Sequence, residues 1–244
     1  MPALANDVIV VTGASRGLGR AMVERFSDEG ARVVLTARDE ERMTEIVADL
    51  SGESLVVPAD VRDADAVERV VDRTIDEFGR VDALVNNAGV SLLGMYDGRT
   101  PLEEINEDDW DTILEVNIKG VFLFTRAVLP HMYEQGHGNV INISSGLGRN
   151  AIGGAGPYVS SKWGLEGLTR TTAIEAEDCG VNANALDPGG RVDTDIWAHL
   201  PDEERERILD PDVMNDAAVL LAAQGPDGVS GESMPAEEWE RRLG

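Results

Sequence analysis

The chain contains a single cysteine, Cys179, and only three histidines among its 244 residues. One cysteine cannot form an internal disulfide, which suits a reducing cytosol. The histidines have neither the spacing nor the cysteine partners of a zinc site, so we expect no metal. The sequence also lacks an apolar run as long as a membrane span, and its N-terminus has no signal pattern. These absences predict a cytoplasmic protein.

Positive charge is scarce as well. The chain has 46 acidic and only 21 basic residues, which gives a formal net charge of −25. Such a chain repels nucleic acid and anionic membrane surfaces, which argues against both as partners. Only Lys119 and Lys162 are lysines, and the other 19 basic residues are arginines. The acidic residues are spread along the chain rather than gathered in a tail, a pattern that favours a surface adapted to concentrated salt.

A glycine-rich loop follows the first apolar run. Residues 7–12 (DVIVVT) predict a buried strand, and the segment from residue 17 to residue 29 predicts a helix. Glycines between them let the backbone turn tightly, and the amides at the helix N-terminus would face a pyrophosphate. The loop could be purely structural, but its place between strand and helix favours a dinucleotide cofactor. The candidate contacts are Gly13, Ser15, Arg16, Gly17, Leu18 and Gly19.

The tip of the next predicted strand, residues 32–36, bears on the choice of cofactor. An acidic residue there holds the ribose 2′-hydroxyl of NAD, whereas an arginine accommodates the 2′-phosphate of NADP. Here Ala37 and Arg38 follow the strand, and Arg16 lies in the glycine loop. Asp39 is the competing acid, but the acidic residues after it make it fit a helix N-cap. We therefore expect NADP(H) as the cofactor. NAD(H) is the alternative cofactor, and the alternative interpretation of the two arginines is that they are merely solvated.

Two further predicted strands end in polar residues. Asp60 follows the strand at residues 55–57, where its carboxylate could hold an adenine amino group, with a helix cap as the alternative. Two asparagines and a glycine follow the strand at residues 83–85. Ligands of open parallel sheets bind in the crevice outside the carboxyl ends of the strands. The candidate cofactor site therefore gains Asp60, Val61, Asn87, Ala88 and Gly89.

Tyr158 and Lys162 lie four residues apart in a predicted helix, so their side chains share one face. A phenol has an unperturbed pKa of about 10, and a nearby ammonium lowers that pKa and makes the hydroxyl a usable acid or base. Ser145 follows the predicted strand at residues 139–143 and could hold a carbonyl oxygen. Ser144 is the rival hydroxyl, but neighbouring strand residues face opposite sides. An ordinary polar helix face is the alternative interpretation of the tyrosine and lysine.

Asn117 lies on the apolar face of a long predicted helix that begins near Trp110, and a buried amide requires a hydrogen-bond partner. The acidic segment at residues 190–212 predicts a substrate lid, and a last helix is expected over residues 213–223. Strands and helices alternate without a linker or a repeat. This pattern predicts one α/β domain over residues 1–244, a doubly wound, mainly parallel Rossmann-type sheet with helices on both faces.

Taken together, these motifs resemble the short-chain dehydrogenase/reductase family. They occur in the family's order and spacing over nearly the whole chain, and they look most like those of 3-oxoacyl reductases and related NADPH-linked carbonyl reductases. The matching motifs are Thr12-Gly13-x-x-x-Gly17-x-Gly19, Asn86-Asn87-Ala88-Gly89, Asn117, Ser145, Tyr158-x-x-x-Lys162 and Pro188-Gly189.

The resemblance implies a role for each matching position. Tyr158 would give a proton to a carbonyl oxygen that Ser145 holds, and Lys162 would bind the nicotinamide ribose and lower the pKa of Tyr158. Asn117 would anchor a water that links Lys162 to solvent. Hydride would pass directly from the nicotinamide to the carbonyl carbon, without a metal. The implied cofactor contacts include Tyr158, Lys162, Pro188, Gly189, Val192 and Thr194.

Three features depart from the family pattern. Gly190-Arg191 lengthens the turn after Pro188-Gly189 by one residue, beside the positions of Val192 and Thr194. The loop at residues 91–100 is longer than in similar proteins, which would reshape the rim of the pocket. Residues 231–239 lack the family's usual final strand and its V-D-G-G ending, so a homodimer stands beside a homotetramer as the expected assembly.

The predicted activity is the NADP(H)-dependent reduction of a ketone or 3-oxoacyl group to the secondary alcohol. An alcohol or sugar dehydrogenase that works in the oxidising direction is the second hypothesis, because the reaction is reversible. A catalytically silent NADP-binding sensor is the alternative of another class. A sensor should have lost part of its catalytic set, and this chain keeps Ser145, Tyr158 and Lys162.

Overall fold

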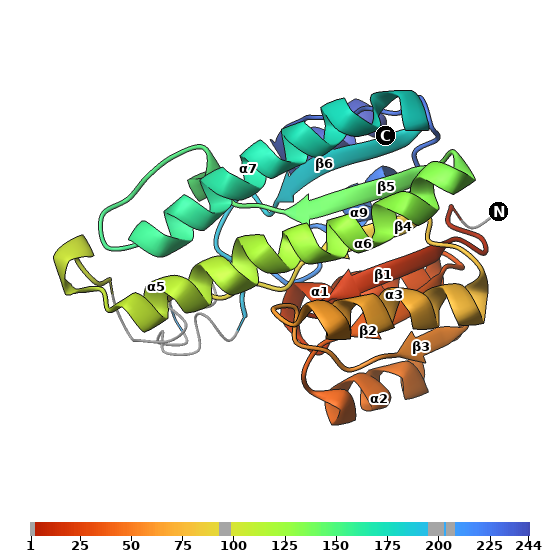
Figure 1. Ribbon diagram of the computed structural model, residues 1–244, viewed down its shortest axis with the longest axis horizontal. Helices are drawn as coiled ribbons and strands as arrows, with labels where there is room; N and C mark the ends of the chain where they lie inside the picture. The colour runs from red at the N-terminus through yellow and green to blue at the C-terminus, as the bar shows by residue number, and fades with distance from the viewer. Residues whose placement is uncertain (1–2, 93–98, 195–202, 204–207) are drawn as a thin grey trace.

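A seven-stranded sheet lies at the centre of the computed structural model, which describes residues 3–92, 99–194, 203 and 208–244. The strands follow the order β3-β2-β1-β4-β5-β6-β7, and every neighbouring pair is parallel (Figure 1). The order reverses between β1 and β4, which is where ligands bind in sheets of this kind. The strands are β1 Val8–Thr12, β2 Arg32–Thr36, β3 Ser54–Val56, β4 Ala83–Asn86, β5 Gly138–Ile143, β6 Val181–Asp187 and β7 Ser233–Pro235.

Both faces of the sheet are buried, which explains why β1 is a continuous apolar run rather than an alternating one. Ile9 and Val11 pack into one hydrophobic cluster, whereas Val8 and Val10 pack into the cluster on the opposite face. Successive side chains of a strand point to opposite faces, so one short run of valine and isoleucine supplies both cores.

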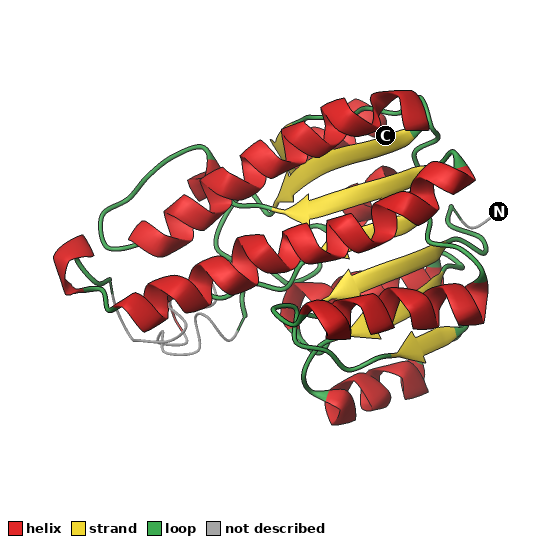
Figure 2. Ribbon diagram, viewed as in Figure 1, coloured by secondary structure: helices red, strands yellow, loops and turns green. Residues whose placement is uncertain are grey.

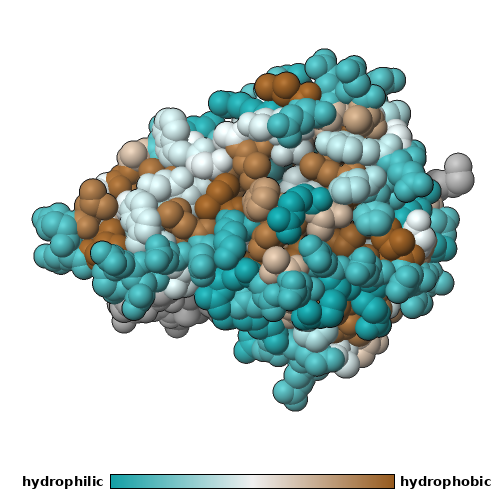
Figure 3. All heavy atoms as spheres, viewed as in Figure 1, coloured by the Kyte–Doolittle hydropathy of each residue, from teal (hydrophilic) through white to brown (hydrophobic). Residues whose placement is uncertain are grey.

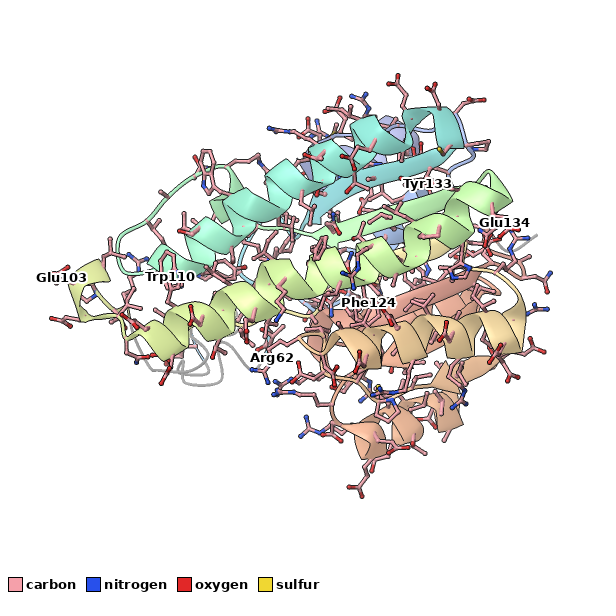
Figure 4. All side chains as sticks on the ribbon, viewed as in Figure 1. Arg62, Glu103, Trp110, Phe124, Tyr133 and Glu134 are labelled. Atoms are coloured by element: carbon pink, nitrogen blue, oxygen red, sulfur yellow. The ribbon has the colours of Figure 1, made fainter. Side chains whose placement is uncertain are left out.

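Two layers of helices cover the sheet (Figure 2). The first layer contains α1 Gly17–Asp28, α2 Glu40–Asp49, α9 Asn215–Ala222 and α10 Ala236–Leu243, and the second contains α3 Ala64–Phe78, α6 Gly120–Gln135 and α7 Gly156–Ala176. Phe124 of α6, labelled in Figure 4, is a fully buried member of the second layer. The doubly wound fold predicted from the sequence is therefore confirmed.

Helix boundaries follow local chemistry. Asp39 caps α2, because its side chain accepts a hydrogen bond from the backbone of Arg42 at 3.1 Å, as predicted. The cap of α3 is Asp63 and not Asp60, so the capping alternative for Asp60 is wrong. The helix of Tyr158 ends in a short 3₁₀ turn before Gly180, whose φ of 71° makes it a left-handed stop.

The predicted helix after Trp110 is divided into α5 Glu107–Leu114, a five-residue π-helical segment Glu115–Lys119, and α6. The apolar periodicity continues through all three pieces, which is why the sequence suggests one helix. Single π-helical turns inside α-helices frequently mark functional sites, and this one contains Asn117.

The prediction that residues 231–239 lack a final strand is wrong. Ser233–Pro235 forms β7, which pairs in parallel with the end of β6, and α10 follows it, so the helix near residues 213–223 is not the last. The sequence carries no clear signal for this strand, because it has only three residues and ends in a proline. Its anchor is Trp239, which is fully buried and donates a hydrogen bond from Nε1 to the carbonyl of Ala185 at 3.0 Å.

Within the described residues, no helix has both the length and the apolar character needed to cross a bilayer.

Candidate active site

A cavity of about 1730 Å³ opens along the carboxyl edge of the sheet. The loops that follow β1, β2, β4, β5 and β6 all contribute to its wall, together with one face of α7. Ser145 and every candidate cofactor residue except Gly19 line it, while Gly19 and Asn117 are buried behind the wall. The lining candidates are Gly13, Ser15, Arg16, Gly17, Leu18, Arg38, Asp60, Val61, Asn87, Ala88, Gly89, Ser145, Tyr158, Lys162, Pro188, Gly189, Val192 and Thr194.

The glycine loop requires its glycines for two separate reasons. Gly13 and Gly17 have φ angles of 65° and 52°, which residues with a side chain rarely adopt. Close packing excludes a side chain at Gly19, since a Cβ there would lie 2.4 Å from the carbonyl oxygen of Gly13. The loop thus turns directly into the N-terminus of α1, where free backbone amides favour an anion such as a pyrophosphate.

The asparagine motif after β4 holds this loop in place. Thr12 Oγ1 accepts hydrogen bonds from the backbone amides of Asn87 and Ala88, both at 3.0 Å. The side-chain amide of Asn87 donates to the carbonyl of Thr12 at 2.9 Å and to that of Gly13 at 3.2 Å. These bonds tie the ends of β1 and β4 together at the point where the strand order reverses.

Arginines line the end of the cavity near the tip of β2. Arg38 and Arg42 both line it, and Arg42 also pairs with Asp39 at 3.3 Å. Arg62, labelled in Figure 4, precedes α3. It pairs with Asp60 at 2.7 Å. The hydrogen bond from Arg62 holds the pKa of Asp60 below its ordinary value, so this carboxylate stays ionised.

Asn117 has the specific partners that a buried amide requires. Its Oδ1 accepts from the backbone amide of Val90 at 2.8 Å, and its Nδ2 donates to the carbonyl of Val90 at 2.9 Å and to Ser161 Oγ at 3.1 Å. The residue is fully buried. It therefore links the π-helical segment to the strand-end loop of β4 and to the helix of Tyr158.

The two serines after β5 both line the cavity but have different partners. Ser144 is buried and donates to Glu166 Oε1 at 2.5 Å. Ser145 begins a 3₁₀ turn, where its Oγ accepts from the amide of Leu147 at 3.2 Å. Ser145 and Tyr158 both line the cavity.

Burial governs the titration of the tyrosine and lysine. It raises the pKa of Tyr158, and the hydrogen bond with Ser145 opposes that change. Burial also lowers the pKa of Lys162 to about 8. Lys162 Nζ donates to the carbonyl of Ile143 at 2.7 Å and lies 5.6 Å from the centre of the Tyr158 ring. Ser145 thus offsets part of the rise in the pKa of Tyr158. The lowering of that pKa by Lys162, which the family resemblance implies, stays a prediction.

The turn after β6 closes the other side of the cavity. Asp187 Oδ1 accepts from the amide of Gly189 at 2.8 Å, and Gly189 has a φ of 77°. Thr194 lies against the glycine loop, since a Cβ at Gly17 would come within 3.2 Å of its Cγ2. Most of the predicted lid, namely residues 195–202 and 204–207, and most of the 91–100 loop, residues 93–98, lie outside the described residues.

Sequence reasoning missed two charged residues on this wall, Arg149 and Asp187. Arg149 pairs with Asp187 and with Glu166, and it donates to Ser233 Oγ at 2.5 Å. No spacing rule predicts these contacts, because the partners of Arg149 lie 17 to 84 residues away along the chain. Among the described residues, no group of acidic, histidine or cysteine side chains is arranged to hold a metal ion.

A doubly wound parallel sheet, with a glycine loop and a serine, tyrosine and lysine gathered at its carboxyl edge, defines the class of Rossmann-type oxidoreductases. Comparison with known proteins agrees, because residues 7–205 match the family model described as short chain dehydrogenase. The chain belongs to this family.

Curated relatives cover nearly the whole chain. The (2S)-[(R)-hydroxy(phenyl)methyl]succinyl-CoA dehydrogenase subunit BbsD of Thauera aromatica is 37% identical, over 94% of each chain. The 3-oxoacyl-[acyl-carrier-protein] reductase FabG of Thermotoga maritima is 32% identical, over 94% of this chain and 95% of its own. A 3-oxoacyl-[acyl-carrier-protein] reductase of Synechocystis is 37% identical over 82% of this chain.

Proposed function

We propose that this protein is an NADP(H)-dependent oxidoreductase that reduces a ketone or 3-oxoacyl group to the secondary alcohol by direct hydride transfer. The observation that carries the proposal is that Ser145 and Tyr158 line one cavity together with the glycine loop and Lys162. A carbonyl oxygen placed between the two hydroxyls would accept a hydrogen bond from each of them. Tyr158 would transfer its proton to this oxygen as negative charge develops on it.

The cofactor supplies the hydride, and the residues of this chain hold it. Backbone amides at the start of α1 suit the pyrophosphate, and Lys162 is assigned to the nicotinamide ribose beside Pro188, Gly189, Val192 and Thr194. Asp60 and Val61 are assigned to the adenine. An ionised Asp60 still has lone pairs for an amino group, because a carboxylate accepts several hydrogen bonds.

We infer a preference for NADP(H) from the β2 tip. Ala37 stands where an acidic residue would bind the ribose 2′-hydroxyl of NAD, and Arg38 is exposed at the same edge of the cavity. Asp39 is occupied as the cap of α2. A guanidinium pairs with a phosphate through two parallel hydrogen bonds, so Arg38 suits a 2′-phosphate better than a hydroxyl.

The names of the relatives support the substrate class that we propose. Several of them are named as reductases of 3-oxoacyl groups on an acyl carrier, and one is named as a dehydrogenase of a CoA thioester. A 3-oxoacyl thioester, or its 3-hydroxy product, is therefore the substrate we propose first. The name of the Thauera relative also favours the oxidising direction as the second candidate, in which Tyr158 acts as the base.

We propose a homodimer or homotetramer in the cytoplasm, with no nucleic acid or membrane as partner. Figure 3 shows a face that is mostly hydrophilic, with apolar side chains scattered along α5, α6 and α7. Phe122 of α6 and Trp163 and Ile174 of α7 expose 44%, 53% and 74% of their surface. We propose this surface of α6 and α7 as the place of contact with a second copy.

A cofactor assay with a panel of substrates tests the proposal. The protein is mixed in molar KCl with NADPH and a series of ketones and 3-oxoacyl thioesters, and with NADP⁺ and the matching alcohols. We expect the cofactor absorbance to change with at least one thioester. Binding of NADPH without turnover of any compound would instead support the silent sensor.

A further inference from the structure

Arg149 joins four separate elements of the active-site wall. It follows the 3₁₀ turn of Ser145, and its guanidinium pairs with Asp187 at the end of β6. It also lies 3.5 Å from Glu166 on α7 and donates to Ser233 of β7 at 2.5 Å. Side chains that are 38 and 84 residues apart from Arg149 are thus held by one planar group.

The two acidic partners of Arg149 are each bonded in turn to a part of the active-site wall. Asp187 accepts the backbone amide of Gly189, in the turn assigned to the nicotinamide. Glu166 lies one helical turn beyond Lys162 and accepts from Ser144, the neighbour of Ser145, at 2.5 Å. Ser233 also donates to Glu166, at 2.8 Å. The set formed by Arg149, Glu166, Asp187, Ser144 and Ser233 is called the Arg149 cluster below.

The Arg149 cluster holds two carboxylates for one guanidinium. Glu166 and Asp187 are both nearly fully buried, and Glu166 Oε2 has no hydrogen-bond partner among the described residues. A buried carboxylate without a cation is unfavourable and disturbs the charge of its neighbours. Asp187 acts to raise the pKa of Tyr158, and Glu166 acts to raise the pKa of Lys162. Removal of Arg149 would strengthen both effects, because the guanidinium offsets part of each carboxylate's field.

We propose that Arg149 is a positioning residue of the active site, which fixes the Ser145 turn against the Tyr158 helix and the Gly189 turn and balances the two carboxylates that face Tyr158 and Lys162. The catalytic part of this assignment rests on the proposed function, whereas the electrostatic part concerns the protein alone. Arg149 acts through Glu166 and Asp187, so it differs from Ser145, Tyr158 and Lys162 in not contacting the reacting atoms.

The scarcity of lysine makes the electrostatic part directly measurable. Protein labelled with ¹³C at the lysine ε carbon gives two signals, from Lys119 and Lys162, and Lys119→Arg assigns them. The Lys162 signal of the wild type should titrate near pH 8. In Arg149→Met the midpoint should rise by about one pH unit, since an unopposed carboxylate favours the ammonium. In Arg149→Met/Glu166→Gln the Lys162 midpoint should return to the wild-type value or below. The titration midpoint of the Lys119 signal should stay the same in all these variants.

Kinetics test the positioning part on the same variants. Arg149→Met should lower kcat about tenfold while the KM for NADPH stays within about twofold, because orientation at the reacting carbon is lost and cofactor contacts are kept. Arg149→Lys restores the charge but not the planar guanidinium, and it adds a third lysine signal to the two of the wild type. The Lys162 midpoint should recover in this variant while kcat stays low. A purely structural arginine would lower the melting temperature and leave both the midpoint and the kcat of the folded protein unchanged.

The outcomes separate this inference from the proposed function. An unmoved Lys162 midpoint in folded Arg149→Met overturns the inference, even if the wild type proves an active reductase. A wild type that reduces no carbonyl compound overturns the proposed function, while the titration still judges the electrostatic role of Arg149. If Arg149→Met does not fold, Arg149→Met/Asp187→Asn removes one charge of each sign. Its Lys162 midpoint should then exceed that of Asp187→Asn alone, and equal midpoints overturn the inference.

Discussion

At the scale of single residues, Lys162 is unusual because its ionisable amino group is buried in the protein. Burial lowers its pKa from an ordinary value of 10.5 to about 8, so the ammonium is easier to deprotonate than in an unfolded chain. Around neutral pH the side chain is still charged, and it relies on the carbonyl of Ile143 and the field of Glu166 for compensation. A lysine held in this way can give up or receive a proton near the pH at which enzymes work.

This burial predicts how stability depends on pH. Between pH 8 and pH 10 the unfolded chain keeps the proton of Lys162 while the folded protein releases it, so stability rises with pH. The unfolding free energy of the wild type should rise relative to Lys162→Met by about 2 kcal/mol over this window. Tyr158 has the opposite sign, but its raised pKa lowers stability only above about pH 10.

Denaturant unfolding at several pH values measures this linkage. Lys119→Met is the matched control, because Lys119 is half exposed and pairs with Glu115 at the surface. A free-energy difference between wild type and Lys162→Met that stays constant from pH 8 to pH 10 would contradict the burial of an ionisable lysine.

At the scale of elements, the loop between β2 and α2 decides the choice of cofactor. Changing Ala37 to Asp and Arg38 to Leu places a carboxylate at the strand tip and removes the guanidinium. NADPH affinity should fall about 10- to 100-fold, the range for a lost hydrogen-bonded charge, and NADH affinity should rise. Fluorescence titration with each cofactor measures the change, and Arg73→Leu on the exposed face of α3 is the control. Equal affinity of the wild type for both cofactors would refute the assignment.

The elements also show how far sequence reasoning reaches. The strands β1 to β6, the glycine loop and the helix of Tyr158 could be predicted because each is encoded locally, by apolar runs, by glycines and by spacing along one helix face. The strand β7 could not, since three residues ending in Pro235 have no period of their own and take their conformation from pairing with β6. The Arg149 cluster was likewise invisible, because its contacts exist only after β5, α7, β6 and β7 have come together.

At the scale of the whole molecule, the net charge of −25 is the dominant feature. A folded chain with this charge repels itself in dilute buffer. The Debye length falls from about 10 Å at 0.1 M salt to about 3 Å at 1 M, so molar salt should remove most of that repulsion. We therefore expect the melting temperature and the activity to rise steeply from about 0.1 M to above about 1 M KCl.

Melting curves in KCl and NaCl check this expectation and its cause. Screening alone makes the two salts equivalent, whereas bound cations of one kind would separate them. A melting temperature that stays flat or falls as salt is added would rule out adaptation to salt, and it would leave the assignment of the active site unchanged.

The central claim is that Tyr158 delivers the proton in an NADPH-dependent carbonyl reduction, and the direct test compares the wild type with Tyr158→Phe in molar KCl. This change keeps the ring and removes only the transferable proton. With a 3-oxoacyl thioester that the wild type reduces, we predict that NADPH consumption falls by about two to four orders of magnitude, the range for general acid–base catalysis. NADPH binding, followed by fluorescence on the same samples, should be nearly intact. A Tyr158→Phe protein that consumes NADPH at the wild-type rate would contradict the account.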